Sequence, residues 1–417
     1  MMNAPPQPQH RSFCARQPIF NERGEIWGYE LLYRAEPDTL EASFFNGDKA
    51  SLKVAAEAFL GQDPANAHGK LCINLTASSD NAQLPYALPA TKTVIELPEI
   101  IEPSLELIEN LDTLRDGGYT IALDGLNELV VGHPMLSRCS VIKVDVLQRD
   151  RSEIVRIIDG LEVYGAILAA KRVETREHFD VLVELGFKLF QGFFFMEPEM
   201  LPGRTLSSNE ASRLKLFKLI QEDDPDIAKL SEAIKFDASI SYRLLNRLNS
   251  SAYGFKESIT SIKHAIVLLG WKHLRNWLRV IILTDLKPPG QSTELIYWSA
   301  QRAKFFDLVA EEHQCASHVK AHAFLFGLFS LLDSILGMPM PSILQAIRID
   351  ASLSKALQGG EGGLFDGWVN MAKAFEDADW CALEACLDRA NLDAMKVAKA
   401  HFDAVEWTNR FLGTAES

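Results

Sequence analysis

Short apolar runs alternate with segments of helical periodicity through residues 13–200. The runs of apolar and β-branched residues predict strands at 13–19, 26–34, 71–75, 93–97, 119–123, 141–146, 166–170 and 188–192. Between them, apolar positions three and four residues apart predict helices at 49–60, 103–116, 151–164 and 176–185. This alternation implies a parallel sheet, and a sheet of seven or eight strands implies a closed α/β barrel of the TIM type.

The alternation ends near residue 200. Pro198, Pro202 and Gly203 interrupt any regular pattern, and Ser207-Ser208-Asn209-Glu210 has the composition of a capping box that begins a helix. The rest of the chain has helical periodicity, which predicts helices at 210–221, 226–235, 240–248, 262–269, 272–283, 293–313, 319–336, 341–347, 366–376 and 392–411. We expect a multidomain chain with a disordered tail at 1–12, the barrel at 13–200, a linker at 201–208 and an all-α domain at 209–417.

Composition narrows the classes of protein that fit. A length of 417 residues, with 47% hydrophobic and 24% charged residues, is typical of a globular protein with two domains. The formal charge of −14 is unfavourable for binding a phosphate backbone. Basic residues do occur between 243 and 279, but they alternate with core leucines. We therefore do not expect a nucleic-acid partner.

The sequence predicts neither a membrane segment nor an export signal. The longest apolar stretch, 321–338, is interrupted by His322, Ser330 and Asp333, which favours a buried helix. The polar start of the chain lacks the apolar core of a signal peptide. Six cysteines occur without a Cys-x-x-Cys pair, which indicates reduced thiols. We expect a cytoplasmic protein that makes no membrane contact.

Polar residues recur where the predicted strands end. Four of them lie at or near the end of an apolar strand, namely Asn74, Glu96, Asp124 and Asp145. Glu174 follows the next predicted strand, and Gln191 lies at the end of the last one. A single acidic residue in this place is usually a helix cap. Six in order favour the active-site rim of a barrel. Glu30, inside an apolar strand, is costly unless a cation or hydrogen-bond donors meet it. Such oxygen ligands suit hard cations such as magnesium, manganese or calcium.

Several of these residues lie in recognisable motifs. The motifs are Gln17-Pro18-Ile19, Glu30-Leu31-Leu32 followed by Arg34, Ile73-Asn74-Leu75, Ile142-Lys143-Val144-Asp145, and Gln191-Gly192-Phe193. In this order they resemble the EAL family of phosphodiesterases, which open cyclic di-GMP, over about residues 13–200. The resemblance implies a first metal site, for one Mg²⁺ or Mn²⁺, at Glu30, Asn74, Glu96 and Asp124. It also implies candidate nucleotide contacts at Gln17, Arg34, Lys143, Asp145, Glu174 and Gln191.

Two departures from the EAL pattern bear on catalysis. The family has a second aspartate where this chain has Gly125, and a glutamate where this chain has Lys171, or Arg172 if the register slips by one residue. A cation at that place repels a second metal ion, and we expect it to pair with Asp124. A lysine cannot generate a metal hydroxide, so we expect no catalytic residues. Glu30, Lys143 and Lys171 could equally form a satisfied ion-pair network that binds no ligand.

The second half resembles the HDOD family over about residues 205–400, on the segments 237–245, 248–253 and 259–271. HDOD domains are relatives of metal-dependent HD phosphohydrolases and are treated as interaction modules. Where a catalytic relative has its His-Asp dyad, this chain has Ser330 and Leu331. The resemblance therefore implies protein partners and no catalysis in this half.

Three hypotheses follow from the two resemblances. The leading one is a non-catalytic signalling protein of the cyclic di-GMP network, regulating motility or biofilm formation, whose barrel senses a nucleotide or partner and whose HDOD domain binds other signalling proteins. The second is a weak phosphodiesterase that uses one metal. The third is a protein scaffold that binds no nucleotide. EAL barrels often dimerise, so the resemblance also implies a homodimer as a candidate assembly.

Overall fold

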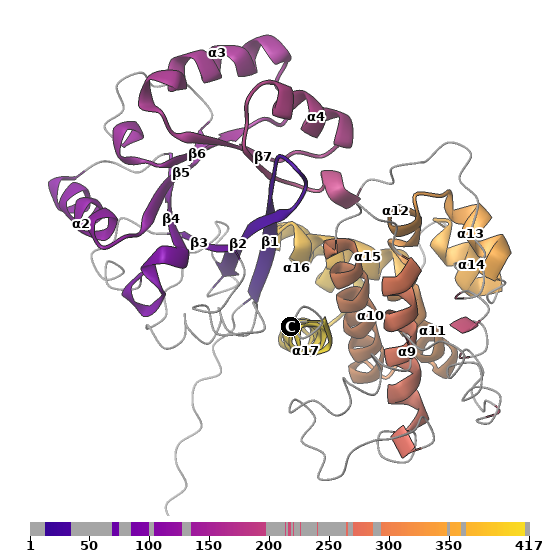
Figure 1. Ribbon diagram of the computed structural model, residues 1–417. Helices are drawn as coiled ribbons and strands as arrows, with labels where there is room; N and C mark the ends of the chain where they lie inside the picture. Colours follow the sequence, from indigo (N-terminus) through magenta and orange to yellow (C-terminus); the bar gives the residue numbers. More distant parts are fainter. Residues whose placement is uncertain are drawn as a thin grey trace, which may run out of the picture. The chain divides into compact units, whose positions relative to one another are not determined.

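The computed structural model describes most of both halves of the chain (Figure 1). The described residues are 13–34, 69–74, 85–99, 104–126, 135–196, 270–286, 293–347, 351–359 and 364–412, with single positions 213, 216, 217, 220, 226, 240, 264 and 265. They fall into two compact units. The first comprises 1–197 and 370–409, and the second comprises 198–369 and 410–417.

Eight strands close into a barrel in the order of the sequence. They are β1 (Phe13–Asn21), β2 (Ile26–Arg34), β3 (Lys70–Asn74), β4 (Thr93–Pro98), β5 (Thr120–Leu126), β6 (Val141–Asp145), β7 (Ile167–Lys171) and β8 (Leu189–Gln191). The predicted barrel is thus confirmed, with every strand on a predicted run.

The sheet differs from the prediction in one respect, because β1 is antiparallel to both β2 and β8. The turn between β1 and β2 is too short for a crossover helix, and it therefore forms a hairpin. The Asn21 side chain holds this turn by accepting hydrogen bonds from the backbone N–H groups of Arg23 and Glu25, at 2.9 and 3.0 Å. Gly24 supplies the positive φ of 72° that the turn requires.

The barrel lumen consists of two layers with different chemistry. The first is a buried apolar layer of Ile19, Cys72, Val94, Ala122, Val141, Ala169 and Leu189, against which Trp27 packs. Side chains two positions apart on a strand share a face. The next lumen positions toward the carboxyl ends of the parallel strands are therefore Asn74, Glu96, Asp124, Lys143, Lys171 and Gln191, and Gln17 on the reversed β1. We call these seven residues, with Glu30 of β2, the polar ring.

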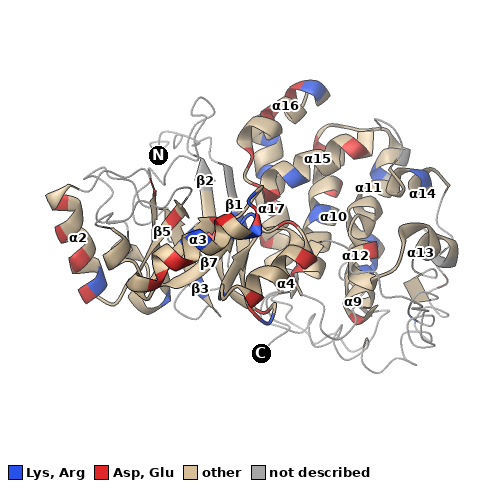
Figure 2. Cartoon of the chain, turned by 90° about the horizontal axis from the view of Figure 1, so that it is seen from above, with Lys and Arg blue, Asp and Glu red and all other residues tan. Residues whose placement is uncertain are grey.

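Three helices follow strands of the barrel and lie on its outside (Figure 1). They are α2 (Leu105–Asp116), α3 (Arg151–Leu161) and α4 (Arg176–Glu184), all on predicted segments. Each begins at a capping side chain, which is Ser104, Asp150 and Thr175 respectively. Acidic residues recur along α2 (Figure 2), from Glu106 in its first turn, where the helix dipole favours an acid, to Asp116 at its end beside Arg115. The predicted helix 49–60 lies outside the described residues.

The chain ends in α15 (Leu364–Glu376), α16 (Trp380–Ala390) and α17 (Ala394–Leu412). Residues 370–409 of this segment belong to the same compact unit as the barrel. The helix α16 was not predicted, although Trp380, Leu383 and Leu387 form its buried stripe and Asp379 caps it. The predicted domain boundaries remain predictions.

The second unit contains α9 (Trp271–Leu286), α10 (Glu294–Glu312), α11 (Ser317–Phe329), α12 (Leu332–Leu336), α13 (Met340–Ile347) and α14 (Ala351–Leu357). Gly327 lets α11 approach α10 closely, since a Cβ there would lie 2.5 Å from the backbone nitrogen of Ala303. The prediction of one continuous helix over 319–336 is wrong, because the segment forms two helices, α11 and α12. It breaks at Ser330, whose hydroxyl donates to the carbonyl of Gly327 at 2.8 Å.

The other predictions for this half have mixed outcomes. The helix α14 was missed, because its seven residues include one buried apolar side chain, Leu353. The predicted helices before residue 262 and the capping box at 207–210 fall on residues that are largely outside the described part of the chain. Among the described helices, none combines the length and apolar composition needed to cross a bilayer.

Candidate functional site

Glu30 lies at the centre of the polar ring and is 1% exposed. Its carboxylate accepts hydrogen bonds from Lys143 Nζ at 2.8 Å, Gln191 Nε2 at 2.8 Å and Asn74 Nδ2 at 2.9 Å. Burial opposes ionisation of Glu30, but the charges of Lys143 and Lys171 and the hydrogen bonds outweigh it and lower its pKa. A cation and amide donors thus meet the carboxylate that the sequence marked as costly.

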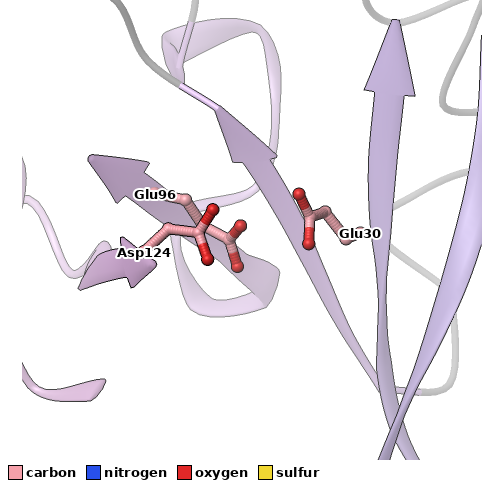
Figure 3. Close-up of side chains that lie close together, drawn as sticks. All are labelled: Glu30, Glu96 and Asp124. Carbon is pink, nitrogen blue, oxygen red and sulfur yellow. The ribbon is translucent and has the colours of Figure 1, made fainter. Parts of the chain in front are cut away.

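Two further carboxylates lie beside Glu30. Oxygen atoms of Glu30, Glu96 and Asp124 lie within 4.8 Å of one another, and Figure 3 shows Glu30 facing the other two. Lys143 Nζ is 2.6 Å from Glu96 Oε1, whereas Glu96 Oε2 is buried and accepts no hydrogen bond of normal geometry among the described residues. Burial and the charge of Glu30 raise the pKa of Glu96 to about 8. Glu96 Oε2 could therefore serve as a ligand to a metal ion.

Lys171 occupies the other side of Asp124. Its Nζ lies 2.7 Å from Asp124 Oδ2 and 3.0 Å from Oδ1, so it is the lysine that makes the pair expected from the sequence. Burial of Lys171 disfavours its charge, but Glu30 and Asp124 outweigh this and raise its pKa. Lys171 is therefore a permanent ammonium group at the end of β7.

Arg172 neutralises a second carboxylate. Its guanidinium donates to both oxygens of Asp145, with Nε 2.8 Å from Oδ1. The backbone of Arg172 has a φ of 64°, which turns its side chain toward β6 while Lys171 reaches β5. Sequence reasoning treated the two cations as alternatives and missed that each has its own partner. The signal was the adjacency of two cations where two carboxylates end neighbouring strands.

The predicted nucleotide contacts have different surroundings. Lys143 is 2% exposed and forms ion pairs with Glu30 and Glu96. Asp145 pairs with Arg172 and accepts a hydrogen bond from the backbone N–H of Leu147. Gln191 is buried and donates to Glu30 and to Gln17. Lys143 and Gln191 therefore share one hydrogen-bonded network around Glu30, whereas Asp145 forms a separate ion pair with Arg172.

Three other sequence candidates lie elsewhere or have a different role. Glu174 lies exposed, three residues beyond β7. Arg34 ends β2 opposite Phe13, and its side chain is outside the described part. Gly125 has a φ of 79°, a backbone conformation that glycine adopts more readily than aspartate.

The donor set fits one hard cation. Three carboxylates and the Asn74 amide can supply oxygen ligands, and the unbonded Oε2 of Glu96 points to spare capacity. Lys171 engages both oxygens of Asp124 and Arg172 engages those of Asp145, so a cation that uses Asp124 as a ligand has to displace Lys171 from it. The three carboxylates and the two lysines of the ring carry a net charge of about −1 when all are ionised.

Comparison with known proteins finds a domain family that matches part of the second half and relatives that cover nearly the whole chain. Residues 206–348 match the HDOD domain family. YuxH of Bacillus subtilis is 31% identical over 415 residues, which cover 96% of this chain and 99% of YuxH. A Vibrio cholerae protein named cyclic di-GMP phosphodiesterase CdgJ is 29% identical over 406 residues, which cover 96% of this chain and 93% of that protein.

Solved structures also resemble part of the chain. Klebsiella pneumoniae BlrP1, in a complex with manganese and cyclic di-GMP, is 25% identical with a TM-score of 0.37, covering 46% of this chain and 57% of that chain. A standalone EAL protein from Vibrio cholerae, in its cyclic di-GMP-bound form, is 22% identical with a TM-score of 0.37, covering 45% of this chain and 92% of that chain.

Proposed function

Because this chain belongs to the EAL–HDOD family of two-domain proteins, we propose that it is a non-catalytic regulatory protein of the cyclic di-GMP network. In this proposal the EAL-type barrel senses a nucleotide or a partner, and the HDOD domain binds other signalling proteins. The processes regulated are motility or biofilm formation, in the cytoplasm. A homodimer through the barrel is part of the proposal and is tested by the mass of the protein in solution.

The observation that carries the proposal is the pair of ionic contacts from Lys171 to Asp124 and from Arg172 to Asp145. Phosphodiester hydrolysis by two metal ions needs anionic ligands for both. An ammonium about 4 Å from a divalent ion opposes its binding by roughly 8 kcal/mol at an effective dielectric constant of about 20. Neither cation can supply a hydroxide nucleophile, so the barrel is suited to recognition without turnover.

One metal ion is compatible with this function. Glu30, Asn74, Glu96 and Asp124 would hold Mg²⁺ or Mn²⁺, which when bound would offer a positive charge to a phosphodiester oxygen. Lys143 acts through Glu30 and Glu96, whose carboxylates it holds in place. Gln17, Arg34, Glu174 and Gln191 remain candidate contacts for the nucleotide.

Calorimetry and a hydrolysis assay test the proposal together. We expect cyclic di-GMP to release heat on binding to the full chain with Mg²⁺ or Mn²⁺ present, and no linear dinucleotide to form above the level of Glu30→Ala. Product above that control would overturn the non-catalytic assignment. Absence of binding heat under every condition would instead support the scaffold.

A weakened one-metal phosphodiesterase is the second candidate. The uncommitted oxygen of Glu96 favours it, as does the name of the relative CdgJ. Its distinguishing result is slow hydrolysis that depends on Mn²⁺ and is lost in Glu96→Gln. The Lys171→Met variant separates the two candidates further, since removal of the ammonium would raise the rate of a metal-dependent enzyme and would leave a pure sensor inactive.

A further inference from the structure

A chain of side-chain hydrogen bonds runs from the polar ring to the C-terminal helices of the same unit. Gln191 Nε2 donates to Glu30 Oε2 at 2.8 Å and to Gln17 Oε1 at 2.9 Å. Gln17 Nε2 in turn donates to the main-chain carbonyl of Glu376 at 2.9 Å. Two glutamines thus connect a carboxylate in the lumen to a residue 359 positions away from Gln17 in the sequence.

The orientation of each amide in this chain fixes the orientation of the next. Gln191 is 3% exposed, and both hydrogens of its amide nitrogen are used, one by Glu30 and one by Gln17. If Glu30 Oε2 is taken by a bound cation, Gln191 can turn its own oxygen toward the site. Gln191 Oε1 is buried without a hydrogen-bond partner among the described residues, so it is available for that role.

The reversal passes to the second glutamine. After Gln191 has turned, its oxygen faces Gln17 Oε1, and two acceptors cannot form a hydrogen bond. Gln17 must therefore reverse its own amide, so that its Nε2 donates to Gln191. A reversed Gln17 places its oxygen opposite the carbonyl of Glu376, which is also an acceptor. The bond from Gln17 to Glu376 is therefore incompatible with the reversed arrangement.

Glu376 is the last residue of α15, where helix carbonyls lack intrahelical donors. Its neighbour Phe375 stacks on His401 of α17 with ring centroids 4.0 Å apart and contacts Trp380 of α16 edge to face. A change at Glu376 thus reaches all three helices.

We propose that Gln191 and Gln17 couple occupancy of the polar ring to the C-terminal helical segment 370–409, by releasing Glu376 when the ring binds a cation or a nucleotide. This inference rests on the proposed sensor function, and it assigns residues 370–409 as the element that reports the bound state. The two glutamines act as positioning residues here.

Hydrogen exchange of the full chain, followed by mass spectrometry, tests the coupling without any ligand. Loss of one hydrogen bond corresponds to roughly a 2- to 12-fold rise in local opening. We expect a rise in this range for peptides across 370–390 in Gln17→Ala and Gln191→Ala. The matched control is Thr93→Val, because Thr93 is also buried in the barrel and donates one hydrogen bond, to the carbonyl of Pro89, outside the chain of glutamines. An equal rise in Thr93→Val, or none in the glutamine variants, would overturn the proposal.

A second arm adds Mn²⁺ alone, with calorimetry to establish whether it binds. If Mn²⁺ binds, the coupling requires faster exchange across 370–390 in the wild type and no further increase in Gln17→Ala. Binding without any change in exchange overturns the coupling while the sensor function stands. Absence of Mn²⁺ binding counts against the proposed metal site, and the ligand-free variants then decide the coupling on their own.

Discussion

Lys171 on β7 reaches past the intervening strand β6 to pair with Asp124 on β5, with Nζ 2.7 Å from Oδ2. The strand that it passes ends in Asp145, which receives Arg172 instead. Two consecutive residues thus neutralise two carboxylates on two strands. The carboxylates of Glu30 and Asp124 raise the pKa of Lys171, so its positive charge is a fixed part of this arrangement.

The Lys171→Glu variant is expected to make the barrel dependent on metal. Four carboxylates would then share the ring region, and loss of the pair with Asp124 would lower stability by roughly 1–3 kcal/mol in metal-free buffer. Mn²⁺ is expected to restore the melting temperature, as measured by thermal unfolding with and without the ion. Lys171→Met is the control, since it loses the pair without adding a ligand. A melting temperature of Lys171→Glu that ignores Mn²⁺ would contradict this account.

Lys143 is expected to be the most stabilising charge of the ring. Lys143→Met leaves Glu30 and Glu96 buried without their shared cation, which costs about 3–5 kcal/mol for a broken buried pair. Urea unfolding of the full chain measures this loss. Adding Glu30→Gln to the same variant is expected to recover part of it, because one buried charge is then removed. If the double variant is as unstable as the sum of the single variants, the two residues are not coupled.

His401 is expected to contribute a pH dependence to stability. Burial lowers its pKa from 6.5 to about 3, so the folded chain keeps this imidazole neutral while the unfolded chain takes up a proton. The contribution is fully present above pH 6.5 and is lost as the pH falls, by about 1.4 kcal/mol for each pH unit below it. Unfolding at about pH 7 and about pH 5 gives the size. His401→Phe, which keeps the stack on Phe375, is expected to show a smaller decrease than the wild type. An equal decrease in both proteins would assign the pH dependence to other groups.

Gly192 is expected to tolerate no side chain. Its φ is 145°, and a Cβ would lie 2.2 Å from the backbone oxygen of Val173. Gly192→Ala is therefore expected to cost about 3 kcal/mol or more and to displace the adjacent Gln191. Gly165→Ala is the comparison, because its φ of 63° is also positive but nothing lies within 4 Å, and about 1–2 kcal/mol is expected there. Similar melting temperatures for the two variants would exclude the close approach as the cause.

A feature of this structure could be predicted from the sequence when the residues that determine it are close together along the chain. The strands were predictable because their apolar runs are local, and the polar ring was predictable because Asn74, Glu96 and Asp124 each end such a run. The contact between Gln17 and Glu376 was not predictable, since no pattern along the chain relates residues so far apart. The partner of Arg172 was missed because its positive φ is set by tertiary structure. The break at Ser330 was hidden because apolar residues continue through it.

The apolar layer beneath the polar ring has a consequence for how this chain can change over time. Because the side chains of this layer are buried and apolar, they stabilise an unbalanced charge in the ring poorly. An exchange of one member is therefore tolerated best when a neighbour changes with it, as an acid for a base and a base for an acid. Sequences descended from a common ancestor with this chain are accordingly expected to vary at these positions in sets.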